Sequence, residues 1–267
     1  MSQEHYFEAL GDGRYQPTIN VQGAWSPEEQ HVAPVIGLLL HALERNHPRE
    51  DLQWARISVD ILGFIRRAET SVTTRVLRAG RTIELLEATA KIDGRDTVRA
   101  TAWRLVRGDT SENAGAPTPE GPPMPGPDDV PVWDGMLHWG GGFIKSVEFR
   151  SAGNEPGRGR TWVRTPVALV SGEPSSPLAS WVGLLDTANG TAVRKDPREW
   201  MFPNVDLTLH LHRIPEGPWV GLDTRVSWGP TGVGATSSVV HDRLGPVGTV
   251  EQCLTIRPIE QPGSAQA

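Results

Sequence analysis

The sequence predicts an α+β fold built from two similar halves, each with one long helix wrapped by a curled antiparallel sheet. Three observations indicate this fold. A strongly apolar helical segment occurs once in each half, four β-rich segments follow it, and a proline-rich stretch separates the halves. Adjacent strands beside one helix are typical of folds in which a sheet covers the helix. At about 150 residues per domain, the 267 residues suffice for one large domain or two small ones.

The helix expected in the first half covers residues 35–43. Nearly every position in it is apolar, which is typical of a helix that is buried on all sides. Pro34 precedes it, where the first helical turn tolerates proline. An extended segment is expected at 15–21. After the helix, strands are expected at 57–65, 71–77, 82–92 and 97–106. These four segments are rich in Val, Ile and Thr and are separated by turn sequences.

The second half repeats this order. Ser176-Pro177 combines a helix cap with proline at the first helical position, which predicts a helix over 178–188 that ends at Asn189-Gly190. Ser58-Val-Asp60 recurs as Asn204-Val-Asp206, 146 residues later (206 minus 60), which supports an internal repeat. Extended segments are expected before the helix and strands after it, at 143–150, 160–170, 205–212, 219–227, 234–241 and 248–256.

A proline-rich stretch divides the two halves. Residues 114–131 hold seven prolines, a composition that favours an extended, poorly ordered connector. The predicted organisation is therefore an N-terminal unit, a proline-rich linker, a C-terminal unit and a short tail, at 1–110, 111–135, 136–262 and 263–267.

Composition excludes several classes of protein. Lys plus Arg number 26 against 32 for Asp plus Glu, and the net charge of -6 is opposite to that of an electrostatic nucleic-acid binder. Cys253 is the single cysteine, so no internal disulfide can form. The N-terminus lacks the pattern of a secretion signal, and the longest apolar run, residues 32–43, falls short of the roughly 20 residues that cross a bilayer. We therefore expect a cytoplasmic protein without nucleic-acid or membrane partners.

Other catalytic motifs are missing from the sequence. It contains no G-x-S-x-G nucleophile turn, no H-E-x-x-H zinc motif and no phosphate-binding P-loop. A metal held by Asp206 and His210 is also disfavoured, because these residues would lie about 13 Å apart along one strand. We expect no metal and no organic cofactor.

Several segments of the chain resemble a known family. They are Phe7-Glu-Ala-Leu-Gly-Asp-Gly-Arg-Tyr15, Val147-Glu-Phe-Arg150, Asp206-Leu-Thr-Leu-His-Leu-His-Arg213, the strand with Trp219, and Val250-Glu-Gln-Cys-Leu-Thr-Ile-Arg257. With them the chain resembles the double-hotdog acyl-CoA thioesterases of the acyl-CoA thioesterase II type, over nearly its whole length except the linker. The resemblance implies a double hotdog fold and hydrolysis of an acyl-CoA substrate to free acid and CoA.

The resemblance also implies a catalytic set of an aspartate, a serine or threonine, and a glutamine in the second unit. The matching positions are Asp206, Ser227 and Gln252, with Thr224 or Thr231 as alternatives to Ser227. An aspartate can take a proton from an attacking water, a hydroxyl can donate and accept, and an amide can position the water. One difficulty is that strand alternation points Asp206 away from the leucine face, so a site between sheets or a bulge is required.

Asp186 is a separate candidate, because a carboxylate inside an apolar helix is costly without a partner. It is either a helix acid that does the chemistry, as in single-hotdog thioesterases, or a carboxylate paired with an arginine. The helix start at 177–179 is the expected source of N–H donors for an oxyanion.

The chain departs from the family where its first helix begins. It has His31-Val-Ala-Pro34 where many relatives have a Gly-Gly pair. This departure favours an alternative function, a non-catalytic acyl-CoA or small acyl-ligand binding protein of the same fold. A hotdog hydratase is a third hypothesis. A homo-oligomer, such as a dimer of double hotdogs, is expected because sheet edges or faces can pair.

Overall fold

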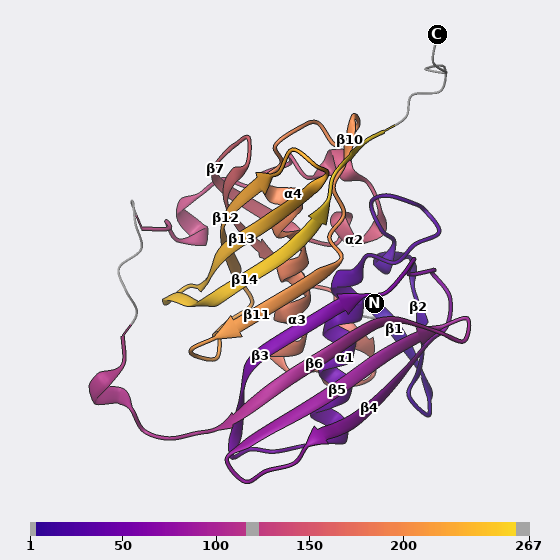
Figure 1. Ribbon diagram of the computed structural model, residues 1–267, viewed down its shortest axis with the longest axis vertical. Coiled ribbons are helices and arrows are strands. Elements are labelled where there is room, and N and C mark those ends of the chain that lie inside the picture. The colour runs from indigo at the N-terminus through magenta and orange to yellow at the C-terminus, as the bar shows by residue number, and fades with distance from the viewer. Residues whose placement is uncertain (1–3, 116–122, 260–267) are drawn as a thin grey trace.

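The computed structural model describes residues 4–115 and 123–259, and it places the helices against one large sheet (Figure 1). The first half contains β1 (His5–Gly11), β2 (Arg14–Pro17), α1 (Val32–Asn46), β3 (Leu52–Ile61), β4 (Thr70–Arg78), β5 (Ile83–Ile92) and β6 (Arg95–Val106). The second half contains α2 (Gly142–Lys145), β7 (Glu148–Glu155), β8 (Arg158–Arg164), β9 (Ala168–Ser171), α3 (Pro177–Gly183), α4 (Ala188–Thr191), β10 (Trp200–Met201), β11 (Asp206–Leu211), β12 (Val220–Trp228), β13 (Val233–Asp242), β14 (Gly245–Thr255) and β15 (Arg257–Pro258).

Within the described ranges, 13 strands form a single sheet. Its order is β7-β8-β12-β13-β14-β11-β3-β6-β5-β4-β2-β1-β9. The halves meet at its centre, where β11 pairs with β3 antiparallel and Asp206 lies opposite Asp60. They meet again at one end, where β9 pairs with β1 in parallel. Strand pairing therefore joins the two halves into one sheet.

Helix α1 lies in the core, as its apolar sequence predicts. All of its residues from Val32 to Leu43 are buried, and it packs against β4, β5, β6 and β9. It begins at His31, whose Nδ1 accepts the N–H of Ala33 at 3.2 Å. A histidine thus occupies the N-cap, a position where a short polar side chain is more usual.

Helices α1 and α3 run antiparallel, and two glycines allow their close approach. A Cβ on Gly37 would lie 2.8 Å from the carbonyl oxygen of Ala179, and a Cβ on Gly183 would collide with the carbonyl oxygen of Ala33. The N-terminus of α1 therefore lies beside the C-terminal end of α3.

The expectation of one continuous helix over 178–188 was wrong. Helix α3 ends at Gly183, and a 3₁₀ turn over Leu184–Thr187 separates it from α4. The Thr187 hydroxyl donates to the carbonyl oxygen of Leu184 at 2.7 Å, a type of bond that often bends helices. Asp186 lies within this turn. A short helix, α2, also occupies part of the segment 143–150 that was expected to be extended.

Part of the predicted linker packs on the second half. Val130 is buried against Trp162 and Trp219, and the Trp162 indole donates to the carbonyl oxygen of Pro125 at 2.8 Å. Residues from about 124 onward thus belong to the packed structure and are not an extended connector. Pro117, Pro119 and Pro122, and the predicted tail at 263–267, lie outside the described residues.

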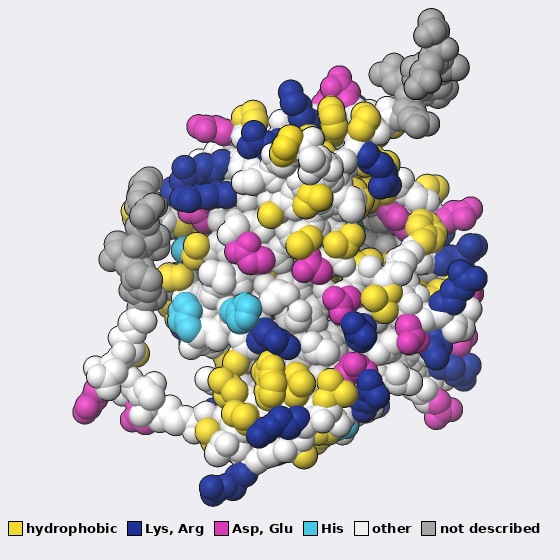
Figure 2. Space-filling view, viewed as in Figure 1, with side chains coloured by type: hydrophobic (Ala, Val, Ile, Leu, Met, Phe, Trp, Pro, Cys, Tyr) yellow, Lys and Arg dark blue, Asp and Glu magenta, His cyan; other side chains and the backbone are white. Residues whose placement is uncertain are grey.

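The outer face of the sheet is mixed in polarity. Hydrophobic side chains gather on one part of it (Figure 2). Leu105 of β6, which lies opposite Ile83 of β5, is on this face and is 40% exposed. Among the helices that the structure describes, none has the length and apolar character needed to cross a membrane.

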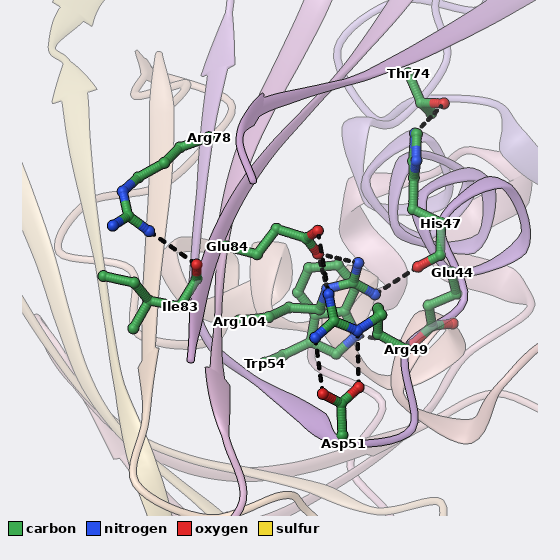
Figure 3. Close-up of polar contacts among 10 residues, drawn as sticks. All are labelled: Glu44, His47, Arg49, Asp51, Trp54, Thr74, Arg78, Ile83, Glu84 and Arg104. Carbon is green, nitrogen blue, oxygen red and sulfur yellow. Dashed lines mark hydrogen bonds and ion pairs between the residues drawn. The ribbon is translucent and has the colours of Figure 1, made fainter. Parts of the chain in front are cut away.

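A buried ionic cluster lies near the C-terminal end of α1 (Figure 3). Arg104 on β6, only 3% exposed, donates to the Glu84 carboxylate through Nε at 3.0 Å and also through Nη2. Its Nη1 donates to the carbonyl oxygen of His47 at 2.6 Å, and its guanidinium lies 4.8 Å from the centre of the Trp54 ring. Each of the three nitrogen atoms of the Arg104 guanidinium donates to an acceptor. The cluster therefore connects β5, β6 and the C-terminal end of α1.

Candidate active site

A cavity of about 200 Å³ opens at the N-terminus of α1. Residues of both halves line it, including His31 and Phe64 from the first half and Asp186, Asn189 and Asn204 from the second. The cavity therefore exists only because the halves pack together.

Asp186 is the centre of the polar contacts in this cavity. Its side chain is 4% exposed. Oδ1 accepts hydrogen bonds from Asn204 Nδ2 at 2.8 Å and from Gln252 Nε2 at 3.3 Å, and Oδ2 lies 3.3 Å from His31 Nδ1. Three residues from three separate segments thus converge on one buried carboxyl group.

Burial changes the acidity of this group. It raises the pKa of Asp186 to about 7, and the hydrogen bonds from Asn204 and Gln252 only partly oppose the shift. A carboxyl group with such a pKa exchanges a proton near neutral pH, which is the property that a general base requires.

His31 is neutral in this environment. Its burial lowers the pKa of the imidazole to about 3, and the ring packs on Phe143 with the centroids 4.3 Å apart. Because Nδ1 accepts the Ala33 N–H, this nitrogen carries a lone pair and no proton. Nδ1 also lies 3.3 Å from Asp186 Oδ2, so a neutral imidazole packs beside the carboxyl group.

Helix α1 also contributes to the electrostatics. Its 15 residues direct the positive end of the helix dipole toward His31 and the cavity. The donors expected at 177–179 lie elsewhere. Ser176 caps α3 by accepting the N–H of Ala179 at 3.0 Å, and it lines a different cavity, with Glu44 at the other end of the helix pair.

Of the three residues expected from the resemblance, Gln252 lies at this site. Asp206 does not reach the cavity with its carboxylate. Its neighbours Leu207 and Leu209 point into the core, while its Oδ1 accepts the N–H of Cys253 at 2.6 Å. Its carbonyl oxygen accepts a hydrogen bond from Asn204 Nδ2 at 3.1 Å, so Asp206 supports Asn204 from behind.

Ser227 also points away from the site. It is exposed near the end of β12, where Val226 is the buried neighbour, because successive strand residues face opposite sides. Thr231 is exposed in the next turn, and Thr224 is buried with its hydroxyl 2.9 Å from that of Ser238. The structure thus brings Gln252 together with Asp186 and not with Asp206 or Ser227.

Sequence reasoning missed two residues of the site. Asn204 was noticed only as part of the repeat, and His31 only as a departure from the family pattern. Of the residues at this site that the family resemblance did not indicate, only Asp186 has a signal in the sequence, because it is a carboxylate in an apolar helix. Neither Asn204 nor His31 carries a local signal, because their partners are distant in the chain.

Comparison with protein families gives two matches along the chain. Residues 21–105 match the acyl-CoA thioesterase N-terminal domain, and residues 119–256 match the acyl-CoA thioesterase C-terminal domain. The second match alone covers more than half of the chain. Among curated proteins no match was found.

Solved structures share the fold. A conserved protein with a hot dog fold from Alicyclobacillus acidocaldarius aligns with a TM-score of 0.69 at 16% identity, covering 95% of this chain and 96% of that one. A tesB protein from Mycobacterium avium subspecies paratuberculosis gives 0.65 at 18%, covering 94% and 96%. Acyl-CoA thioesterase II TesB2 from Mycobacterium marinum gives 0.62 at 16%, covering 98% and 97%. At these identities the likeness shows the fold alone, which is a hotdog fold.

Proposed function

Since the chain belongs to the acyl-CoA thioesterase family, we propose that it hydrolyses an acyl-CoA thioester to free acid and CoA, with Asp186 as the general base. One observation carries the assignment of the base. A carboxyl group that is almost fully buried receives two amide N–H donors and has a pKa near neutrality. Because burial of an ionised carboxyl group costs free energy, a gain in stability does not explain a carboxyl group at this position.

The proposed mechanism begins with a water molecule beside ionised Asp186. Asp186 takes a proton from the water while its oxygen attacks the carbonyl carbon of the thioester. The amide groups of Asn204 and Gln252 hold the carboxylate in position. The backbone N–H of Val32, together with the positive end of the α1 dipole, stabilises the oxyanion. The C–S bond then breaks, and the proton passes from Asp186 to the departing thiolate.

His31 has a supporting role in this mechanism. Its buried, neutral ring lies 3.3 Å from Asp186 Oδ2, so it shields the carboxyl group from solvent and adds no positive charge that would lower the pKa of the base. In this proposal Gln252 stays in the site, but it holds the Asp186 carboxylate and does not position the water as expected from the sequence. Asp206 becomes a support for Asn204, and Ser227 has no part in the reaction.

We also propose that the chain consists of two hotdog units, at 1–110 and 136–262, with the linker between them. The packing of α1 against β4, β5 and β6, and of α4 against β8, β12 and β13, supports this division. Pairing of two such chains in solution stays a prediction.

The test of this function is thiol release by the purified protein over a panel of acyl-CoA esters from short to long chains. We expect saturable turnover on some members of the panel. Saturable binding without turnover on every chain length would instead support the non-catalytic binding protein, an alternative motivated by the His31-Val-Ala-Pro34 departure.

The pH profile of the reaction should follow Asp186. The base acts only when ionised, so kcat/KM should rise about tenfold per pH unit below pH 7 and level off above it. Initial rates between pH 5 and 9, with a stable substrate, give the profile. A rate that stays constant between pH 5 and 8 would contradict the assignment.

The same shift has a consequence for stability. The folded protein keeps the Asp186 proton up to about pH 7, whereas the unfolded chain releases it near 3.8, so this group's contribution is fully present at low pH and is lost as pH rises through 7. His31 acts in the opposite direction below pH 6.5, since burial lowers its pKa. Comparing the free energy of unfolding with that of Asp186→Asn at pH 5 and pH 8 isolates the Asp186 contribution.

A further inference from the structure

The inner face of the second-half sheet carries a row of buried hydroxyl groups. Thr161 on β8, Thr224 on β12, and Thr236 and Ser238 on β13 form this hydroxyl row, and each is at most 2% exposed. Thr236 lies opposite Gln252 of β14, and Ser238 lies opposite Thr224. The row therefore starts beside the proposed active site and continues across the sheet.

The first half shows that such a sheet does not need hydroxyl groups for packing. Its inner positions on β5 and β6 are mostly aliphatic and fully buried, at Leu86, Ala88, Ala90, Val98, Ala100 and Ala102. The polarity of the second half is thus a property of that half and not of the architecture.

Three buried atoms along the row have no hydrogen-bond partner among the described residues. They are Thr161 Oγ1, Thr236 Oγ1 and Gln252 Oε1. Buried polar atoms in folded proteins nearly always have a partner. These atoms belong to strands β8, β13 and β14, and α4 packs over the first two of these strands. Since β13 and β14 are neighbours, one polar group that enters from outside the chain would supply partners for both Thr236 Oγ1 and Gln252 Oε1.

One end of the hydroxyl row lies beside the proposed active site. Gln252 Nε2 donates to Asp186, the proposed base, and its Oε1 remains free. Side chains directly opposite on neighbouring strands have their Cβ atoms about 5 Å apart. Thr236 therefore lies one side chain away from Gln252, which itself contacts the proposed base.

We propose that the hydroxyl row selects a short acyl group that carries a hydroxyl within its first few carbons, such as a 3-hydroxyacyl group. The inference rests on the proposed thioesterase function. A hydroxyl both donates and accepts, so it can donate to Gln252 Oε1 and accept from Thr236 Oγ1. Because the row contains no charged side chain, it suits a neutral substituent and not a carboxylate or an amine.

The test compares 3-hydroxybutanoyl-CoA with butanoyl-CoA. We expect the hydroxy ester to have the higher kcat/KM by about tenfold or more, because a site built for a hydroxyl leaves polar groups unpaired with the plain ester. Thr236→Val keeps the side-chain shape without the hydroxyl, and it should reduce the preference to near unity by slowing the hydroxy ester. Circular dichroism and a melting curve establish that the variant is folded.

Thr97→Val is the matched control. Thr97 is also buried, at 4% exposure, but it lies on β6, and its hydroxyl donates to the carbonyl oxygen of Arg95 at 3.1 Å. This change should leave the preference between the two esters unaltered. Equal kcat/KM values for the wild-type protein, or equal losses on both esters in Thr236→Val, would overturn the inference.

Measuring the binding of each ester tests this inference independently of the proposed thioesterase function. Asp186→Asn removes the base, so calorimetry with this variant measures affinity for each ester without turnover. Tighter binding of the hydroxy ester supports the selectivity of the row, and equal binding overturns it. Absence of turnover with both esters in the wild-type protein would count against the thioesterase function alone, and the binding comparison would still decide the inference.

Discussion

Asp186→Asn is expected to lower kcat for thioester hydrolysis by about a thousandfold, within the range that a general base contributes. Asparagine has nearly the same shape, and its Oδ1 can still accept from Asn204 and Gln252, so the site should remain assembled. It cannot take a proton from water. Steady-state kinetics on the best substrate of the panel measures the loss.

Asp206→Asn is the matched control for this change. The asparagine Oδ1 can still accept the N–H of Cys253, and the carbonyl oxygen that supports Asn204 is unchanged. We expect kcat to stay within a factor of about three, because no group that reacts is removed. If Asp206→Asn abolished turnover while Asp186→Asn retained it, the base would be Asp206 and the proposed site would be wrong.

The Asp186 change should also affect stability. An ionised buried carboxylate is costly, and asparagine removes that cost. We expect Asp186→Asn to be more stable than the wild-type protein at pH 8. Urea unfolding of both proteins at this pH measures the difference. If the variant were equally or less stable at pH 8, burial of the Asp186 carboxylate would not destabilise the folded protein.

The largest loss of stability is expected from Arg104→Met. The change removes the guanidinium that pairs with Glu84 in the buried ionic cluster of Figure 3. The buried Glu84 then keeps only its longer contact with Arg49 Nη1 at 3.7 Å. Breaking a buried ion pair in this way typically costs about 3–5 kcal/mol. Equilibrium urea unfolding, followed by tryptophan fluorescence, measures the change in the free energy of unfolding.

Arg99→Met provides the comparison on the same strand. Arg99 pairs with Asp60 at 2.9 Å, but both side chains are nearly half exposed. Exposed pairs contribute little, so the loss should stay below about 1 kcal/mol. In Arg104→Met, a further Glu84→Gln change should restore part of the stability, because it removes the buried charge. A loss no larger in Arg104→Met than in Arg99→Met would contradict the role of the cluster.

Local patterns were sufficient for the secondary structure of most segments. The apolar residues at 35–43 lie in α1, and the four β-rich segments of each half correspond to β3–β6 and β11–β14, with shifted ends. These patterns succeed because burial of a helix or a strand leaves a periodicity in the sequence itself. The second helix was predicted less well, since the break at Asp186 depends on the side chain of Thr187 and on the packing against α1.

The sequence by itself determined the hotdog fold class and the family resemblance, and it predicted one residue of the proposed site, Gln252. Strand alternation also showed that Asp206 points away from the leucine face, which the structure explains through its bond to Cys253. Only the tertiary structure decided which carboxyl group meets Gln252. Asp186, Asn204 and His31 lie far apart in the chain, and the packing of α1 against α3 and the pairing of β14 beside β11 bring them together. No local pattern encodes that contact, because the raised pKa of Asp186 arises from burial by both halves at once.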